Sequence, residues 1–120
     1  MNAVSLATRV VAHASARREL LQALLDWAAA ARKQTGSLAS DVYEDAERPA
    51  VFMLVSDWDG TAALEAHLRS DAFGVLLGAL ELLAHPPRLK VSRIVESYGA
   101  DALPAIRRLR EAGPLGVPNG

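Results

Sequence analysis

Apolar and polar residues follow two periods along the chain, and these periods predict its strands and helices. Strands are expected where β-branched residues gather or where apolar and polar residues alternate, and helices where apolar residues recur every three or four positions. The pattern predicts strands over residues 4–14, 38–45, 51–58 and 89–98. It predicts helices over residues 16–34, 62–68 and 71–84, and a short further helix from Asp101.

The strongest helix signal lies in residues 16–34, which carry an apolar stripe at helical spacing. The expected buried positions are Leu20, Leu21, Leu24, Leu25, Ala28 and Ala31. Ser15 precedes this helix and Ser70 precedes the helix at 71–84, so each offers a hydroxyl that can cap the first turn. Gly36 is placed to end the first helix.

The strand at 51–58 is apolar on both faces over its first five residues, which favours a central position in a sheet. The order of elements is therefore β-α-β-β-α-β followed by a C-terminal helix. This order predicts an α+β, ferredoxin-like fold, in which both helices cover one face of an antiparallel sheet. We expect one domain at residues 1–98, and a C-terminal helix with a flexible tail at residues 99–120.

A sheet covered on only one face leaves apolar residues of its other face open to solvent. A homodimer that stacks two such sheets would cover them. The C-terminal helix carries its own apolar stripe, which is expected to lie across the partner subunit and consists of Leu103, Ile106 and Leu109.

Composition and charge narrow the classes of protein that the chain can represent. Its 120 residues fit one domain, and 51% of them are apolar, which excludes a disordered segment. A net charge of −1 argues against nucleic-acid binding, and the chain contains no cysteine. No apolar run approaches the roughly 20 residues of a membrane span. We expect a cytoplasmic protein that binds neither nucleic acid nor membrane.

Familiar catalytic motifs are missing from the sequence, and no metal site is predicted. The chain has no glycine-rich phosphate loop and no nucleophile elbow, and its three histidines lie far apart. The strand at 51–58 instead places Phe52, Ser56 and Trp58 on one face. Ser56 is small between two large side chains, which leaves room for a ligand or for a neighbouring side chain of the core.

His67 is the histidine that lies inside a predicted helix, and Leu64 and Leu68 mark the expected buried side of that helix. His67 then borders the apolar stripe, where an imidazole can donate a hydrogen bond to a substrate oxygen or accept a proton near neutral pH. The alternative is a structural histidine whose ring is hydrogen-bonded within the protein.

Two segments resemble the antibiotic biosynthesis monooxygenase family. Residues 52–73 read FMLVSDWDGTAALEAHLRSDAF, a strand ending in Trp58 followed by a helix with the Leu-Glu-Ala-His-Leu segment that ends at Leu68. Residues 35–45 read TGSLASDVYED and resemble an earlier strand of the family, of which Gly36, Val42 and Tyr43 are kept. The resemblance covers roughly residues 4–95.

The resemblance implies a homodimeric α+β barrel that oxygenates a small aromatic or quinol-like compound with molecular oxygen and no cofactor. His67 would be the catalytic residue. The substrate-binding residues implied are Trp58, Tyr43, Phe52, Ser56 and Phe73.

The chain departs from the family pattern where polar side chains are usual. Ser40 stands where a strand tyrosine is common, and Ser56 where a glutamate often precedes the tryptophan. The residues after Phe73 lack the histidine with which relatives bind haem. The missing histidine argues against haem. The two serines favour a first alternative, a non-enzymatic protein that binds a small ligand or acts in a stress response. A second alternative is a cyclase or haem-handling enzyme of related fold.

Overall fold

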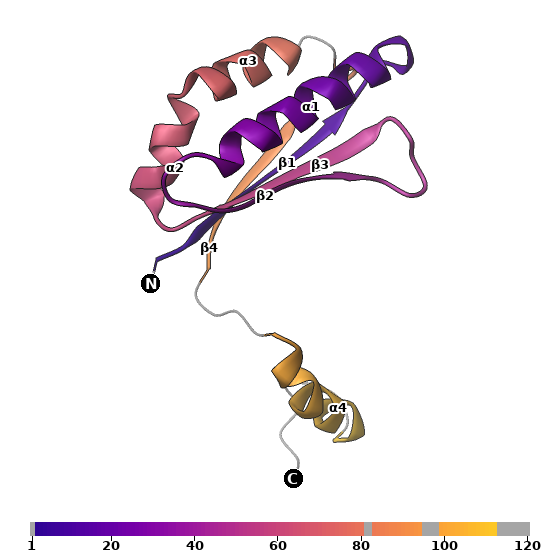
Figure 1. Ribbon diagram of the computed structural model, residues 1–120. Coiled ribbons are helices and arrows are strands. Elements are labelled where there is room, and N and C mark those ends of the chain that lie inside the picture. Colours follow the sequence, from indigo (N-terminus) through magenta and orange to yellow (C-terminus); the bar gives the residue numbers. More distant parts are fainter. Residues whose placement is uncertain (1, 81–82, 95–98, 113–120) are drawn as a thin grey trace.

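The computed structural model describes residues 2–80, 83–94 and 99–112, and its elements follow the predicted order (Figure 1). The strands are β1 (Val4–Val11), β2 (Ser37–Glu44), β3 (Val51–Trp58) and β4 (Arg88–Arg93). The helices are α1 (Arg17–Arg32), α2 (Thr61–Leu68), α3 (Asp71–Ala79) and α4 (Leu103–Glu111). Short 3₁₀ turns, η1 (Ala14–Ala16) and η3 (Ala100–Ala102), precede α1 and α4. The predicted tail at 113–120, and residues 95–98 of the predicted last strand, lie outside the described residues.

The four strands form one antiparallel sheet in the order β2-β3-β1-β4. This confirms the ferredoxin-like fold and the central position of β3, which pairs with β1 from Val4 opposite Trp58 to Val11 opposite Val51. Helices α1, α2 and α3 lie together on one face of the sheet (Figure 1). The core forms between this face and the helices.

Helix α1 buries a narrower stripe than the sequence predicted. Leu20, Leu24, Trp27, Ala28 and Ala31 are its buried residues. Leu25 was expected among them but is 48% exposed. Each residue advances about 100° around a helix, so Leu25 lies well round from Leu24 while Trp27 returns to the buried side.

The turns around the helices explain how the chain reaches the sheet. Ser15 lies inside η1, and no side chain caps the start of α1, so that predicted cap is wrong. The cap at Ser70 is confirmed, because its hydroxyl accepts the backbone N–H of Phe73. Gly36 has a φ of 85°, and a Cβ there would lie 2.5 Å from the Cβ of Ala63. Only glycine fits this close approach of the turn to α2.

Alternate residues of the strands point to opposite faces of the sheet. On the face toward the helices, β1 and β3 bury Val4, Leu6, Thr8, Val10, Phe52, Leu54, Ser56 and Trp58. On the opposite face, Ala7, Met53 and Val55 are half-buried beside Arg9 and Asp57. Figure 1 shows no helix of the described residues covering this second face.

Candidate functional site

His67 lies at the centre of a buried cluster rather than at the border of the core. Its exposed fraction is 1%, and Leu64, one turn earlier on α2, is also buried. The expectation that Leu68 marks the buried side is wrong, since Leu68 is 39% exposed. Residues three apart share a helix face, so the pair that faces the sheet is Leu64 and His67.

Aromatic rings from three elements enclose the imidazole. Trp58, at the end of β3, stacks on it with ring centroids 4.5 Å apart and an angle of 24° between the planes. Phe73 of α3 meets it edge-on at 5.3 Å, and Trp27 of α1 lies tilted at 5.8 Å. The imidazole therefore sits in an apolar cage that excludes water from its faces.

Both ring nitrogens of His67 have hydrogen-bond partners inside the protein. The Trp27 indole Nε1 donates to His67 Nε2 over 3.1 Å. The Gln34 side-chain oxygen lies 2.7 Å from His67 Nδ1. An indole N–H can only donate, so Nε2 must carry the lone pair, and Nδ1 carries the proton that it donates to Gln34. These partners define a neutral imidazole whose N–H points toward Gln34.

Burial lowers the pKa of His67 below its ordinary value of 6.5, because removal from water disfavours the charged form. Between that lowered pKa and 6.5 the unfolded chain binds more protons at this residue than the folded chain does. The contribution of His67 to stability is therefore complete above about pH 6.5 and is lost as the pH falls through the lowered pKa.

We expect the urea midpoint of the wild type to fall between pH 7.5 and pH 5.5 by more than that of His67→Gln. The side chain of that variant does not titrate, so the difference between the two proteins isolates the imidazole. Asp45 also has a lowered pKa, owing to the backbone N–H groups of Glu47 and Arg48, but that carboxyl titrates below this window. Equal pH dependence in the two proteins would contradict a buried neutral His67.

Two buried serines lie side by side under the cage. Ser56 pairs across the sheet with Ser40, and both are buried. The Ser56 hydroxyl accepts the indole N–H of Trp58 over 3.0 Å, so Trp58 itself occupies the space beside Ser56. The Ser40 hydroxyl has no hydrogen-bond partner among the described residues.

The structure brings together four of the six site residues predicted from the sequence. His67, Trp58, Ser56 and Phe73 form the cluster just described. Phe52 shares their sheet face but lies six residues from Trp58 along β3, about 20 Å away. Its ring lies under the guanidinium of Arg17 instead. Tyr43 pairs with Met53 on the opposite face of the sheet and is 55% exposed.

Two residues that complete the cluster were not predicted from the sequence. Trp27 lies three residues after Leu24 on the apolar stripe of α1, so the helical period could have indicated that its side chain faces the core. Gln34 lies beyond the end of α1 and carries no pattern of its own. Its role appears only when the fold brings the turn after α1 against α2.

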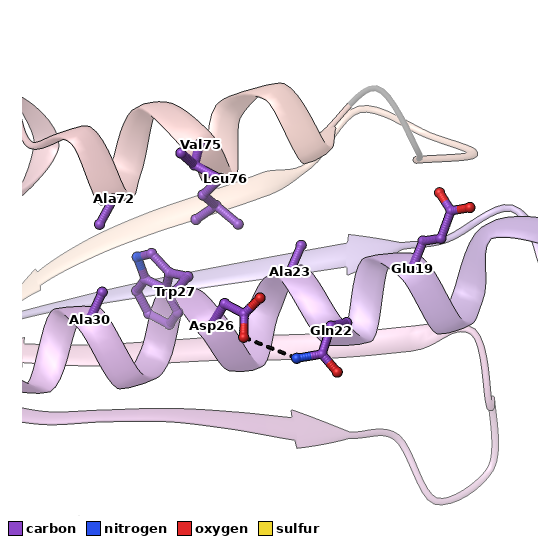
Figure 2. A pocket seen from close by; sticks show the side chains of 9 residues that line it. All are labelled: Glu19, Gln22, Ala23, Asp26, Trp27, Ala30, Ala72, Val75 and Leu76. Atoms are coloured by element: carbon purple, nitrogen blue, oxygen red, sulfur yellow. Dashed lines mark hydrogen bonds between the residues drawn. The ribbon is translucent and has the colours of Figure 1, made fainter.

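Two hollows flank the pair of Trp27 and His67. A pocket of about 380 Å³ lies between the end of α1 and α2, and is lined by Lys33, Gln34, Thr35, Ala63, Ala66 and His67. We call it the Gln34 pocket. A groove of about 500 Å³ lies between α1 and α3, with Trp27 at its base (Figure 2). We call it the α1/α3 groove.

The polarity of these two hollows differs. The Gln34 pocket carries one formal charge, the ammonium of Lys33, beside uncharged polar groups. The α1/α3 groove is apolar at its base, and two carboxylates, those of Glu19 and Asp26, lie on its rim (Figure 2). A ligand that develops negative charge is therefore better placed in the Gln34 pocket.

Among residues 2–80, 83–94 and 99–112, no three His, Asp or Glu side chains gather as metal ligands would. No helix in the described part of the chain is long and apolar enough to cross a membrane.

The antiparallel sheet with helices on one face places the chain among α+β proteins of ferredoxin-like fold. The sequence profile described as "Antibiotic biosynthesis monooxygenase" matches residues 3–76. The chain belongs to this family, which confirms the resemblance found in the sequence. No curated protein matches the chain.

Solved structures of the same fold agree with this assignment. A Deinococcus radiodurans protein that carries the antibiotic biosynthesis monooxygenase name is 26% identical, with a TM-score of 0.75 over 80% of this chain and 96% of that one. A Mycobacterium tuberculosis protein is 22% identical, with a TM-score of 0.75 over 81% and 99% of the two chains. A Bacteroides thetaiotaomicron protein of unknown function, described as a possible oxidoreductase, is 24% identical, with a TM-score of 0.73 over 78% and 98%.

Proposed function

We propose that this chain is a monooxygenase that uses molecular oxygen to oxidise a small hydroxylated aromatic or quinol-type compound bound in the Gln34 pocket. The observation that carries the proposal is the state of His67: a neutral imidazole whose Nδ1–H points at Gln34, which lines that pocket. The cage formed by Trp58, Phe73 and Trp27 fixes the orientation of this donor.

The role of His67 in this proposal is to donate a hydrogen bond rather than to take a proton. Its lone pair at Nε2 is already engaged by Trp27, whereas its N–H is shared with a half-buried side chain at the pocket. A substrate oxygen that displaces the Gln34 carbonyl would accept this N–H. A preorganised donor stabilises an oxyanion most strongly when water is excluded, and the Lys33 ammonium adds to that stabilisation.

The oxidation balances without an additional reductant. Loss of a proton from the substrate to solvent gives an aromatic oxyanion whose ring carbon is electron-rich and reacts with O₂, and a proton is taken back when the reduced oxygen leaves as water. An anthrone CH₂ plus O₂ then gives C=O plus H₂O, with all four electrons coming from the substrate. A quinol plus O₂ likewise gives a hydroxyquinone plus H₂O. The protein supplies binding, orientation and charge stabilisation.

An oxygen electrode can test the proposal with a hydroxylated anthrone as substrate. We expect one O₂ to be consumed per anthrone, and we expect Ala66→Phe, which fills the Gln34 pocket, to raise KM about tenfold, equivalent to about 1.4 kcal/mol of binding. Ala62→Phe is the matched control, because Ala62 is exposed on the same helix but does not line the pocket. Equal KM values for the two variants would place the substrate elsewhere.

Binding without turnover is the second candidate, and one observation favours it. Both His67 nitrogens already have hydrogen-bond partners within the protein, so neither is left free for a substrate. If the chain binds quinones or anthrones but the wild type consumes no oxygen, the protein is a ligand-binding member of the family.

We also propose that the chain is a homodimer formed by stacking the sheet faces that carry Met53 and Val55. These half-buried apolar side chains face away from α1, α2 and α3. Apolar residues on a sheet face without helices are suited to contact with the sheet of a second copy. Sedimentation of the full chain at micromolar concentration should give the mass of a dimer. A monomer under those conditions would contradict this assembly.

A further inference from the structure

Helix α4 has an apolar stripe that no element of residues 2–80 or 83–94 buries. Leu103, Ile106 and Leu109 are each about half exposed. Arg107 and Arg110 lie one turn beyond Leu103 and Ile106, along the edge of the stripe. An isolated helix of nine residues is marginal in water. The helix therefore needs a surface on which to bury the stripe and pair its arginines.

The α1/α3 groove offers a surface of the complementary kind. Its base contains Ala23, Trp27 and Leu76, and its rim carries the carboxylates of Glu19 and Asp26 (Figure 2). Along α1 the groove runs from Glu19 to Ala30, about 17 Å at 1.5 Å per residue, whereas the nine residues of α4 span about 14 Å. The groove and α4 are therefore similar in length and both apolar, and they carry charges of opposite sign.

We infer that α4 of one copy of this chain docks in the α1/α3 groove of a second copy, with Arg107 and Arg110 facing Glu19 and Asp26. The arrangement of the protomer favours docking of α4 in the groove of a second copy over docking in its own groove. α4 lies beyond the end of β4, away from the layer of helices that contains the groove (Figure 1). In a dimer that stacks the open sheet faces, the partner's helices lie on the side toward which α4 projects; this last argument rests on the proposed dimer.

An exchange between two copies is reciprocal, so each copy gives one α4 and receives one. It adds two helix-in-groove contacts to the dimer. The docked helix also covers the outer side of Trp27, whose indole N–H donates a hydrogen bond to His67. It leaves the Gln34 pocket open to a ligand. Failure of the oxygenase proposal would not affect this inference, because the two concern different hollows.

The absence of native cysteine allows a disulfide test with the full chain. Ala23→Cys places a thiol in the groove of one protein, and Ala105→Cys places one beside the stripe of α4 in another. On mixing and mild oxidation we expect a cross-linked heterodimer. Ala29→Cys is the matched control for Ala23→Cys, since Ala29 is exposed on α1 but does not line the groove.

Charge reversal gives a second readout on the same mixture. Reversing Arg107 and Arg110 to Glu in the Ala105→Cys chain should reduce cross-linking about tenfold, because two attractive pairs become repulsive. Reversing Glu19 and Asp26 to Lys in the Ala23→Cys chain should then restore it.

Three results would overturn the inference. The first is equal cross-linking through positions 23 and 29, because docking would then have no preference for the groove. The second comes from a further protein that carries both Ala23→Cys and Ala105→Cys in one chain. A disulfide that forms only within that chain would show that α4 occupies its own groove. The third is charge reversal without effect or without rescue.

Discussion

Replacing Trp58 with alanine should lower the free energy of unfolding by about 3–5 kcal/mol, as expected when a fully buried large aromatic side chain is removed. Trp58 is 0% exposed and stacks on His67, and its indole N–H is held by Ser56. Domains of this kind are stable by only about 5–15 kcal/mol, so the variant should unfold at a much lower urea concentration.

Trp58→Phe is the matched variant, because it keeps an aromatic ring against His67 but loses the N–H that Ser56 accepts. We expect a smaller cost of about 1–2 kcal/mol from the lost hydrogen bond and the small cavity. In Trp58→Ala, water reaches the imidazole, so the pKa of His67 should return toward its ordinary value. A cost below about 1 kcal/mol for Trp58→Ala would show that the side chain is not part of the packed core.

Substitutions at His67 should separate the two hydrogen bonds of the imidazole and reveal which one serves the reaction. The side-chain nitrogen of asparagine occupies the position of Nδ1, and the end of a glutamine reaches the position of Nε2. His67→Asn therefore keeps the donor toward the Gln34 pocket and leaves the Trp27 N–H unpaired. His67→Gln keeps an acceptor for Trp27 and loses the donor.

We expect His67→Gln to lower kcat about 10²-fold, the usual cost of removing one donor to an oxyanion. His67→Asn should retain most of the activity but lose about 1–3 kcal/mol of stability, because a buried N–H is left without a partner. Oxygen uptake and urea midpoints measured on both variants test this. Higher activity in His67→Gln than in His67→Asn would instead assign the reaction to Nε2, as expected of a base.

The sequence predicted the fold well because its strongest patterns are local. The bounds of β3 were predicted as they stand in the structure, since an apolar run between a turn at Pro49 and a break at Gly60 leaves little choice. The family assignment came from the same stretch. The bounds of the weaker elements shifted: α3 ends at Ala79 rather than at 84, and the predicted cap at Ser15 is absent.

The site was harder to predict because it depends on which face each side chain occupies. Tyr43 and Val42 are adjacent on β2, so they must point to opposite faces, and only the pairing with β3 decides which one turns toward the helices. Phe52 and Trp58 share a face, but they lie at opposite ends of β3. Sharing a face did not mean sharing a site.

The state of His67 could not be predicted from the sequence at all. Its partners Trp27 and Gln34 lie 40 and 33 residues away along the chain, and they reach the ring only because α1 and the turn after it pack against α2. A histidine beside an apolar stripe is compatible with a base, a donor or a structural residue. The two partners distinguish these roles because an indole N–H fixes which nitrogen carries the proton.

The most direct test is the ¹⁵N NMR spectrum of the His67 imidazole in the intact 120-residue chain at pH 7. We expect a neutral ring with the proton on Nδ1 and an unprotonated Nε2, and we expect a quinol-type ligand to perturb Nδ1 more than Nε2. A proton on Nε2, or an imidazolium at pH 7, would contradict the hydrogen-bonding arrangement on which the proposed function rests.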